Sequence, residues 1–181
     1  MKKVFFIGVI LVCCVAVVFI SCNKDNSTEA GTTALSTLQV RLTDAPTIFD
    51  EVKVDIREVK VKFSDDSTLT NGGWINLITY PGIYDLLALQ NGVDTLLATG
   101  AFPTQIIKEI RFILGPNNTI KDAGIVYPLV IPGGSESGLK IKVNKKLQET
   151  LETIIIDFDA GLSVKKEGSG DYKLRPVLKI K

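Results

Sequence analysis

The most constraining feature of the chain is a regular alternation of apolar and polar side chains with a period of two residues. Residues 37–43 read TLQVRLT and residues 51–57 read EVKVDIR, so every second side chain is leucine, valine or isoleucine. Successive side chains of a β-strand point to opposite faces of its sheet. The two stretches are therefore expected to be strands with one buried face, and Asp55 and Arg57 are expected on the polar face.

The apolar positions change parity inside the second stretch. They are even-numbered up to Ile56 and odd-numbered at Val59, Val61 and Phe63. One extra residue near Arg57-Glu58 would bring both sets to the same face, which predicts a β-bulge or bend in a continuous strand. The alternative is two separate strands or a short helix.

The rest of the chain continues as short apolar stretches between turn residues. Further strands are predicted at residues 106–114, 124–131, 139–143, 153–159 and 172–180. Pro176 cannot donate to a sheet, so the last strand is expected at an edge. Residues 84–97 allow either a hairpin across Asn91-Gly92 or a short helical turn followed by a strand. Many short strands separated by turns predict an all-β fold, a single β-sandwich of Greek-key or prealbumin-like topology over residues 35–181.

The absence of one residue type restricts the chemistry. The chain has no histidine, and its three cysteines are at positions 13, 14 and 22. Without histidine there is no Ser-His-Asp or Cys-His catalysis. Without histidine or a cysteine in the folded body there is no ordinary zinc or copper site. What remains is chemistry by carboxylates, lysines and hydroxyls, so we expect a protein that is not an enzyme and has no cofactor other than a structural calcium ion.

The first 21 residues follow the pattern of a secretory signal. Lys2 and Lys3 precede residues 4–20, which carry no charge. The following FISC at residues 19–22 resembles the lipobox of bacterial lipoproteins. That resemblance implies cleavage before Cys22, a diacylglyceryl group on its sulfur and acylation of the new amino end. The alternative is an uncleaved membrane anchor, because about 17 apolar residues is the lower limit for a spanning helix.

The lipobox resemblance also implies a location. It places the protein in a Gram-negative envelope, and Asn23 after the cysteine favours the outer membrane, on its periplasmic or its outer side. Each buried methylene contributes about 0.8 kcal/mol, so two or three acyl chains would hold the protein on a membrane. Residues 22–34 are small and polar and predict a flexible tether.

The charge balance gives no sign of a nucleic-acid partner. Removing residues 1–21 takes away two lysines and no acidic residue, which leaves 19 basic and 20 acidic residues and a net charge of −1. A near-neutral body lacks the basic excess of a nucleic-acid-binding domain.

Seven stretches, taken in order, resemble a known family. They are LQVRLTDAPTIFDEVKVDIREVKV, GGWINL, YDLLALQNG, IRFILGPNN, SGLKIKV, IIIDFDAGLSV and YKLRPVLKI. Together they resemble domain-of-unknown-function family 4382, over about residues 35–180. The resemblance implies an extracytoplasmic β-rich domain behind a lipobox, and it implies no reaction and no catalytic residue.

Two aspartates form the sharpest candidate site. If the apolar residues of 154–158 face the core, Asp157 and Asp159 share the other face, about 6.5–7 Å apart. Such a pair can hold calcium, with Asp44 as a third oxygen donor, or act as acid and base in glycoside cleavage. The simpler interpretation is that both aspartates are solvated and that Asp44 bonds backbone donors in a turn.

Three aromatic residues are a second candidate, for ligand binding. Trp74, Tyr80 and Tyr84 lie within eleven residues, and exposed aromatic rings can stack on sugar rings. A single tryptophan in a sandwich more often packs in the core, so we expect core packing for Trp74. Tyr80, next to Pro81, is expected to be exposed.

Basic residues follow the predicted strands near the end of the chain. They are Lys140, Lys142, Lys145, Lys146, Lys173, Arg175, Lys179 and Lys181. Such stripes are commonly solvated faces that discourage aggregation, and an anionic polysaccharide is the other interpretation. The sequence as a whole predicts a lipid-anchored, non-enzymatic envelope protein that binds a glycan or a protein or serves as a structural component of the envelope. The alternatives are a subunit of an adhesin or pilus-like assembly and, third, a carboxylate-dependent hydrolase.

Overall fold

The computed structural model describes residues 35–65, 68–132, 138–148 and 150–181. The predicted signal peptide, Cys22 and the tether lie outside the described residues. Among the residues described, no helix is long and apolar enough to cross a membrane.

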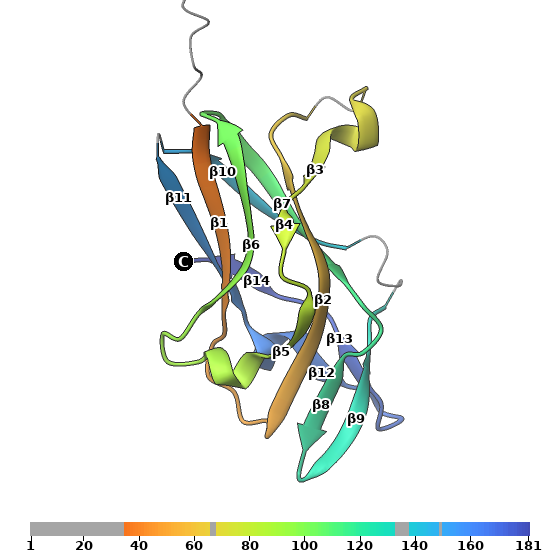
Figure 1. Cartoon of the computed structure of the whole chain (residues 1–181). Helices are drawn as coiled ribbons and strands as arrows, with labels where there is room; N and C mark the ends of the chain where they lie inside the picture. The colour runs from red at the N-terminus through yellow and green to blue at the C-terminus, as the bar shows by residue number, and fades with distance from the viewer. Residues whose placement is uncertain (1–34, 66–67, 133–137, 149) are drawn as a thin grey trace, which may run out of the picture. The chain divides into compact units, whose positions relative to one another are not determined.

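The described chain is an all-β sandwich of two sheets, as the alternation predicted (Figure 1). One sheet has five strands in the order β14-β11-β1-β6-β4, in which β1 runs parallel to β11 and antiparallel to β6. Its strands are β1 (Leu35–Thr43), β4 (Ile78–Thr79), β6 (Thr95–Pro103), β11 (Leu151–Phe158) and β14 (Leu178–Ile180).

The other sheet has nine strands. Seven follow the order β10-β7-β2-β8-β9-β13-β12, and β3 and β5 pair with β2. Its strands are β2 (Glu51–Lys62), β3 (Trp74–Asn76), β5 (Gly82–Asp85), β7 (Ile106–Leu114), β8 (Thr119–Asp122), β9 (Ile125–Val130), β10 (Leu139–Lys146), β12 (Val164–Lys166) and β13 (Tyr172–Leu174). The short helices are the 3-10 turns η1 (Thr70–Gly73) and η2 (Leu86–Leu89) and the one-turn helix α1 (Ala160–Ser163).

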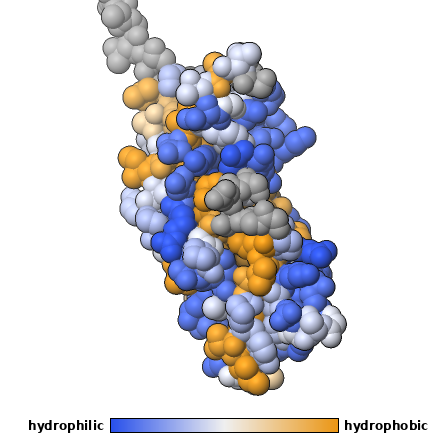
Figure 2. All heavy atoms as spheres, turned by 90° about the vertical axis from the view of Figure 1, so that its right-hand side faces the viewer, coloured by the Kyte–Doolittle hydropathy of each residue, from blue (hydrophilic) through white to orange (hydrophobic). Residues whose placement is uncertain are grey.

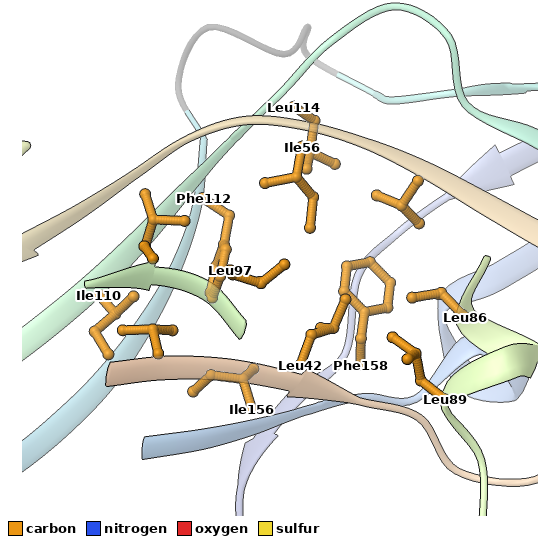
Figure 3. Packing of buried hydrophobic residues seen from close by; sticks show 14 of the residues in the cluster. Leu42, Ile56, Leu86, Leu89, Leu97, Ile110, Phe112, Leu114, Ile156 and Phe158 are labelled. Atoms are coloured by element: carbon orange, nitrogen blue, oxygen red, sulfur yellow. The ribbon is translucent and has the colours of Figure 1, made fainter. Parts of the chain in front are cut away.

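The core lies between the sheets and is built from the apolar positions of the alternation. Leu42 and Ile156 from one sheet face Ile56 and Ile110 from the other, and none of the four is more than 1% exposed (Figure 3). Leu86 and Leu89 of η2 join the same cluster. Full burial of each such side chain contributes about 1.5–3 kcal/mol to folding, so this cluster is the main source of stability.

Strand β2 is continuous and carries the predicted bulge. Its register against β7 shifts between Ile56 and Glu58, so Val54 and Val61 both face the core. The prediction for Asp55 was wrong, because this side chain is fully buried. The turn at residues 115–118 lies over it, and Arg57 Nη2 donates to Asp55 Oδ2 at 2.7 Å.

Residues 74–85 join the two sheets at one side of the sandwich. β3 and β5 pair with β2, whereas β4 between them pairs with β6 of the other sheet (Figure 1). The following residues adopt the second of the two predicted arrangements, since η2 precedes β6 and no hairpin forms across Asn91-Gly92.

The stretch predicted as one strand at residues 172–180 is two strands in different sheets. β13 pairs with β9 and β12, and β14 pairs with β11 at the edge of the five-stranded sheet. Pro176 lies in the gap between them. A residue without an N–H cannot continue a ladder, so the chain crosses from one sheet to the other at this point.

Candidate ligand-binding site

Trp74 lies on the outer surface of the nine-stranded sheet and is not part of the core cluster, so the expectation of core packing was wrong. It is the first residue of β3 and pairs with Lys62 of β2. The side chain is half-buried because basic side chains pack on its ring. The guanidinium carbon of Arg111 is 4.1 Å from the ring centroid, and Lys62 Nζ is 6.0 Å from it.

Arg111 comes from β7 and reaches the tryptophan across β2. Its neighbours in the sheet are Lys60 on β2 and Lys140 on β10. Its Nε is buried and has no hydrogen-bond partner among the described residues. The guanidinium of Arg111 therefore lies over the Trp74 ring without a partner carboxylate in the described part of the chain.

The surroundings of this pair are basic. Because Val59, Val61, Ile110 and Phe112 face the core, the residues between them on β2 and β7 face outward. We call the outer surface of β3, β2, β7 and β10 the basic face, defined by Trp74, Lys60, Lys62, Lys108, Arg111, Lys140 and Lys142.

The basic face carries an excess of positive charge that the rest of the body does not. Its six basic residues are accompanied by three acidic ones, Glu58, Asp65 and Glu109, so its net charge is +3, against −1 for everything after residue 21. Two of the acids neutralise lysines, in the pairs Lys60–Glu58 at 2.8 Å and Lys62–Asp65 at 3.7 Å. Figure 2 shows hydrophilic residues over the upper centre and right of the flank that faces right in Figure 1, with hydrophobic patches along its upper left edge and lower down.

A pocket of about 330 Å³ opens on the same face. It is lined by Asp65, Lys108, Glu109, Lys142 and Asn144. The register of β10 against β7 shifts between Lys142 and Lys145, and Asn144 inside this bulge has a φ of 48°. Bulges redirect side chains and are frequent beside functional sites, and here the bulge places an amide at the rim of a charged pocket.

The other two aromatic candidates lie elsewhere. Tyr84 pairs with Val54, eight residues along β2 from the pairing of Trp74, a separation of roughly 25 Å. Tyr84 packs against the core, its hydroxyl donates to the carbonyl of Tyr80, and burial raises its pKa. Tyr80 is 49% exposed, as expected. The three aromatic residues therefore do not form one site.

The three aspartates of the first candidate are buried. The interpretation of Asp157 and Asp159 as a solvated outer face was therefore wrong, whereas Asp44 does accept from a backbone donor, as expected. Ile154, Ile156 and Phe158 do face the core. Asp159 nevertheless caps α1, because its Oδ1 accepts from Leu162 N at 3.0 Å and its Oδ2 from Lys179 Nζ at 3.0 Å. Burial alone would raise the pKa of Asp159, but these two donors outweigh it and hold the pKa below its usual value.

Asp157 and Asp44 are tied to other partners. Lys181 Nζ lies 3.4 Å from Asp157 Oδ2, and Asp157 Oδ1 has no hydrogen-bond partner in the described part of the chain. Asp44 accepts from Ala160 N at 2.9 Å and from Gln90 Nε2 at 3.1 Å. Its pKa is raised, mainly by burial and slightly by the charge of Asp157.

These contacts favour a structural role for the aspartates. The described residues contain no group of three or more histidine, cysteine or acidic side chains placed to hold a metal ion. Lysines pair with the carboxylates of Asp157 and Asp159. The carboxylate of Asp44 accepts instead from the backbone N–H of Ala160 and the side-chain amide of Gln90. The calcium site stays a prediction, and a calcium-dependent rise in Tm is its test.

Sequence reasoning selected Trp74 and missed Arg111, Lys62 and Lys108. The alternation in residues 106–114 does place Glu109 and Arg111 on one polar face. It does not give the register between β7 and β2, which is what brings the guanidinium over the indole ring.

The comparison with known families assigns the chain. Residues 35–176 match the family described as Domain of unknown function (DUF4382). The chain belongs to the DUF4382 family. The DUF4382 match covers β1 to β13 and so includes the whole basic face and the three aspartates. No curated protein and no solved structure matches the chain.

Proposed function

We propose that this protein is a lipid-anchored, non-enzymatic module of the cell envelope that binds a glycan through its basic face. The observation that carries the proposal is the stacking of Arg111 on Trp74 at 4.1 Å on an outer sheet surface. Tryptophan and arginine are the residue types that most often dominate the binding energy of a recognition surface. A core position would have made Trp74 unavailable to a ligand.

The non-enzymatic part of the proposal is supported by the side chains present. The sequence has no histidine, and its three cysteines all lie before residue 35, where the folded domain begins. The aspartates that could act as an acid and base pair are engaged by Lys179, Lys181 and backbone donors. A glycosidase needs one carboxyl group that protonates the leaving oxygen, and a carboxylate held by a lysine is poorly suited to that step.

The experiment for the binding role uses the tryptophan as its own probe. Trp74 is the single tryptophan of the chain, so a change in its fluorescence on adding a glycan reports on this site alone. The full lipoprotein in detergent micelles is screened on a glycan array. Hits are titrated by Trp74 fluorescence in the wild type and by isothermal titration calorimetry in all variants, because Trp74→Ala removes the only tryptophan. Trp74→Ala is expected to lose binding at least tenfold, whereas Tyr80→Ala, an exposed aromatic outside the face, is expected to bind normally. Absence of any glycan binding, or equal loss in both variants, would refute the proposal.

The lipid anchor on Cys22 is supported by the FISC sequence at residues 19–22 after an uncharged run. Its test is labelling with an alkyne analogue of palmitate in a Gram-negative host, followed by mass spectrometry of the amino terminus. We expect a labelled mature chain that begins at Cys22. Cys22→Ala is expected to abolish the label, and Cys13→Ala and Cys14→Ala to keep it. A wild-type chain that begins at Met1 without label would show that the anchor is not lipid.

A second candidate, a subunit of a surface assembly, is favoured by one edge of the sandwich. β14 covers β11 only at Ile156–Phe158, and residues 151–154 have no strand partner on that side in the described part of the chain. Added strands commonly dock on such edges. One observation counts against this candidate: Glu152 is buried at the same edge and pairs with Lys145 at 2.5 Å, and inward-pointing charges discourage edge pairing. Light scattering distinguishes the two functions, because an assembly subunit gives polymers that a charge on the exposed edge residue, Leu151→Lys, is expected to weaken.

A further inference from the structure

We infer that the ligand of the basic face is an acidic polysaccharide, with its acidic groups on Arg111, Lys140 and Lys142 and a sugar ring against Trp74. The inference rests on the proposed function and adds the chemical class of the ligand. Its starting point is the imbalance of charge on the face, where only two of the six basic residues form an ion pair with a described acidic residue.

The acidic nature of the ligand follows from those cations. Lys60 and Lys62 each have an acidic partner on the face. Arg111, Lys140 and Lys142 have none among the described residues, and Arg111 Nε is shielded from solvent without an acceptor. The guanidinium lies over the Trp74 ring, and its remaining N–H groups form a planar fork, which suits the two oxygens of a carboxylate or a sulfate.

The arrangement of the cations suits repeated negative charges. Arg111 and Lys140 are directly opposite on neighbouring strands, with Cβ atoms about 5 Å apart. Lys142 lies two residues farther along β10, about 7 Å away. The whole face spans four strands, about 15 Å across, which is more than one sugar ring and fits an extended chain laid on the sheet.

The saccharide nature of the ligand follows from Trp74 and the pocket. An acidic peptide or a phosphate needs only the cations, whereas an indole ring adds apolar contact for the C–H groups of a pyranose. The pocket beside it combines Lys108 and Lys142 with the oxygen-bearing Asp65, Glu109 and Asn144. Such a mixed lining can bind both the hydroxyl groups and the acidic group of one sugar unit, and sugar acids carry both kinds of group. Its volume of about 330 Å³ is at the lower end of the range for ligand pockets.

The experiment compares polymers that differ in one property each. The full lipoprotein in detergent micelles is titrated with polygalacturonate, with its methyl ester, with dextran sulfate and with polyglutamate, following Trp74 fluorescence and heat. We expect binding of polygalacturonate that weakens at least tenfold on methyl esterification and at least tenfold from 50 to 200 mM salt, about what releasing a few counterions gives. Dextran sulfate shows whether the site distinguishes a sulfate from a carboxylate. Binding equal to that of polygalacturonate shows that either acidic group suffices, and weaker binding shows that the site prefers a carboxylate.

Matched variants separate the site from general charge. Arg111→Gln is expected to weaken polygalacturonate binding at least tenfold, and Arg111→Lys, which keeps the charge and loses the fork, at least threefold. Arg175→Gln removes the same charge from an exposed arginine outside the basic face and is expected to change binding less than twofold. The double variant Lys140→Gln, Lys142→Gln alters only exposed side chains and repeats the test if Arg111→Gln fails to fold.

The outcomes distinguish this inference from the proposed function. Equal binding of the methyl ester, or glycan-array hits that are all neutral, would overturn the acidic ligand and leave a glycan-binding protein. Polyglutamate binding as tight as polygalacturonate would assign an acidic protein instead. No binding of any glycan would overturn both.

Discussion

At the scale of single residues, the position with the least space for a larger side chain is Gly115, which lies against the buried carboxylate of Asp55 and its partner Arg57. Arg57 Nε is 2.7 Å from Asp55 Oδ1, although not in hydrogen-bonding direction, and Arg57 Nη2 donates to the other oxygen. The side chain of Asn118 joins β2 to the turn at residues 115–118. It accepts from Asp55 N at 2.9 Å and donates to Gly115 O at 2.7 Å. This network covers the bulge of β2 and explains why a carboxylate predicted on the polar face is fully buried.

Gly115→Ala is expected to lower the free energy of unfolding by about 1–3 kcal/mol, the usual cost of overpacking. An added Cβ would collide with the Asp55 carboxylate and lie 2.5 Å from Arg57 Nε. Urea denaturation measures the effect. Gly168→Ala is the control, since its Cβ would meet nothing within 4 Å, and it should change stability by no more than about 0.5 kcal/mol. Equal effects at the two positions would contradict the packing argument.

Asp44 and Asp159 are expected to give opposite pH dependences of stability. The pKa of Asp44 is raised above 3.8 by burial, so its contribution to stability falls as pH rises from below 3.8 through the raised pKa. The pKa of Asp159 is lowered below 3.8 by its donors, so its contribution is present above 3.8 and is lost as pH falls through the lowered pKa. Asp44→Asn should therefore gain stability relative to wild type as pH rises from 3 to about 7, and Asp159→Asn should lose it.

Thermal unfolding of both variants at several pH values measures these differences. Each substitution keeps the shape of the side chain and an oxygen that can accept from Ala160 N or Leu162 N. If the stability of both variants relative to wild type changed with pH in the same direction, the pKa values of Asp44 and Asp159 would not be shifted in opposite directions, and the prediction would be wrong.

At the scale of elements, strands with a long alternation are predictable from sequence. The shortest strands are not, and neither is β6, which has nine residues but no regular alternation. β2 and β7 were predicted, together with the bulge in β2. They have 12 and 9 residues, respectively, which is long enough for the alternation to repeat several times. β3, β4, β8 and β12 have two to four residues each, too few to establish a period. At residues 172–180 the period continues through the gap between β13 and β14, so the pattern alone cannot show that the chain changes sheets.

The candidate sites were limited in the same way. The sequence identified Trp74 and the aspartates as chemical types, but their environments depend on pairings between distant strands. The lysines of β14 reach Asp157 and Asp159 only because β14 lies beside β11, and Arg111 reaches Trp74 only through the register of β7 on β2.

The crossing segment at β4 provides a test at the element scale. Thr79 Oγ1 accepts from Val59 N at 3.0 Å, and Leu77 N donates to Val59 O at 2.9 Å. Thr79→Val keeps the shape and removes the acceptor, which leaves a buried N–H unsatisfied and should cost about 1–3 kcal/mol. Faster hydrogen exchange at Val59 identifies the cause. Thr153→Val is the control and should leave stability and exchange almost unchanged, because this half-buried threonine has no side-chain hydrogen bond to any described residue.

At the scale of the whole body, the two sheets depend on one core and one connecting segment. The core cluster draws residues from both sheets without a break. Residues 74–85 pair with β2, then with β6, and then with β2 again. Neither sheet can therefore lose its partner without exposing its apolar face, and we expect residues 35–181 to unfold as a single cooperative unit.

Calorimetry of the full chain tests this expectation. The calorimetric and van't Hoff enthalpies should agree, and a core substitution in either sheet should lower the same transition. Val40→Ala in β1 and Val61→Ala in β2 are matched, since both side chains are fully buried valines and each deletion should cost about 2–4 kcal/mol. If Val40→Ala shifted one transition and Val61→Ala another, the sheets would be independent folding units. The acidic polysaccharide would then stabilise only the sheet that carries the basic face.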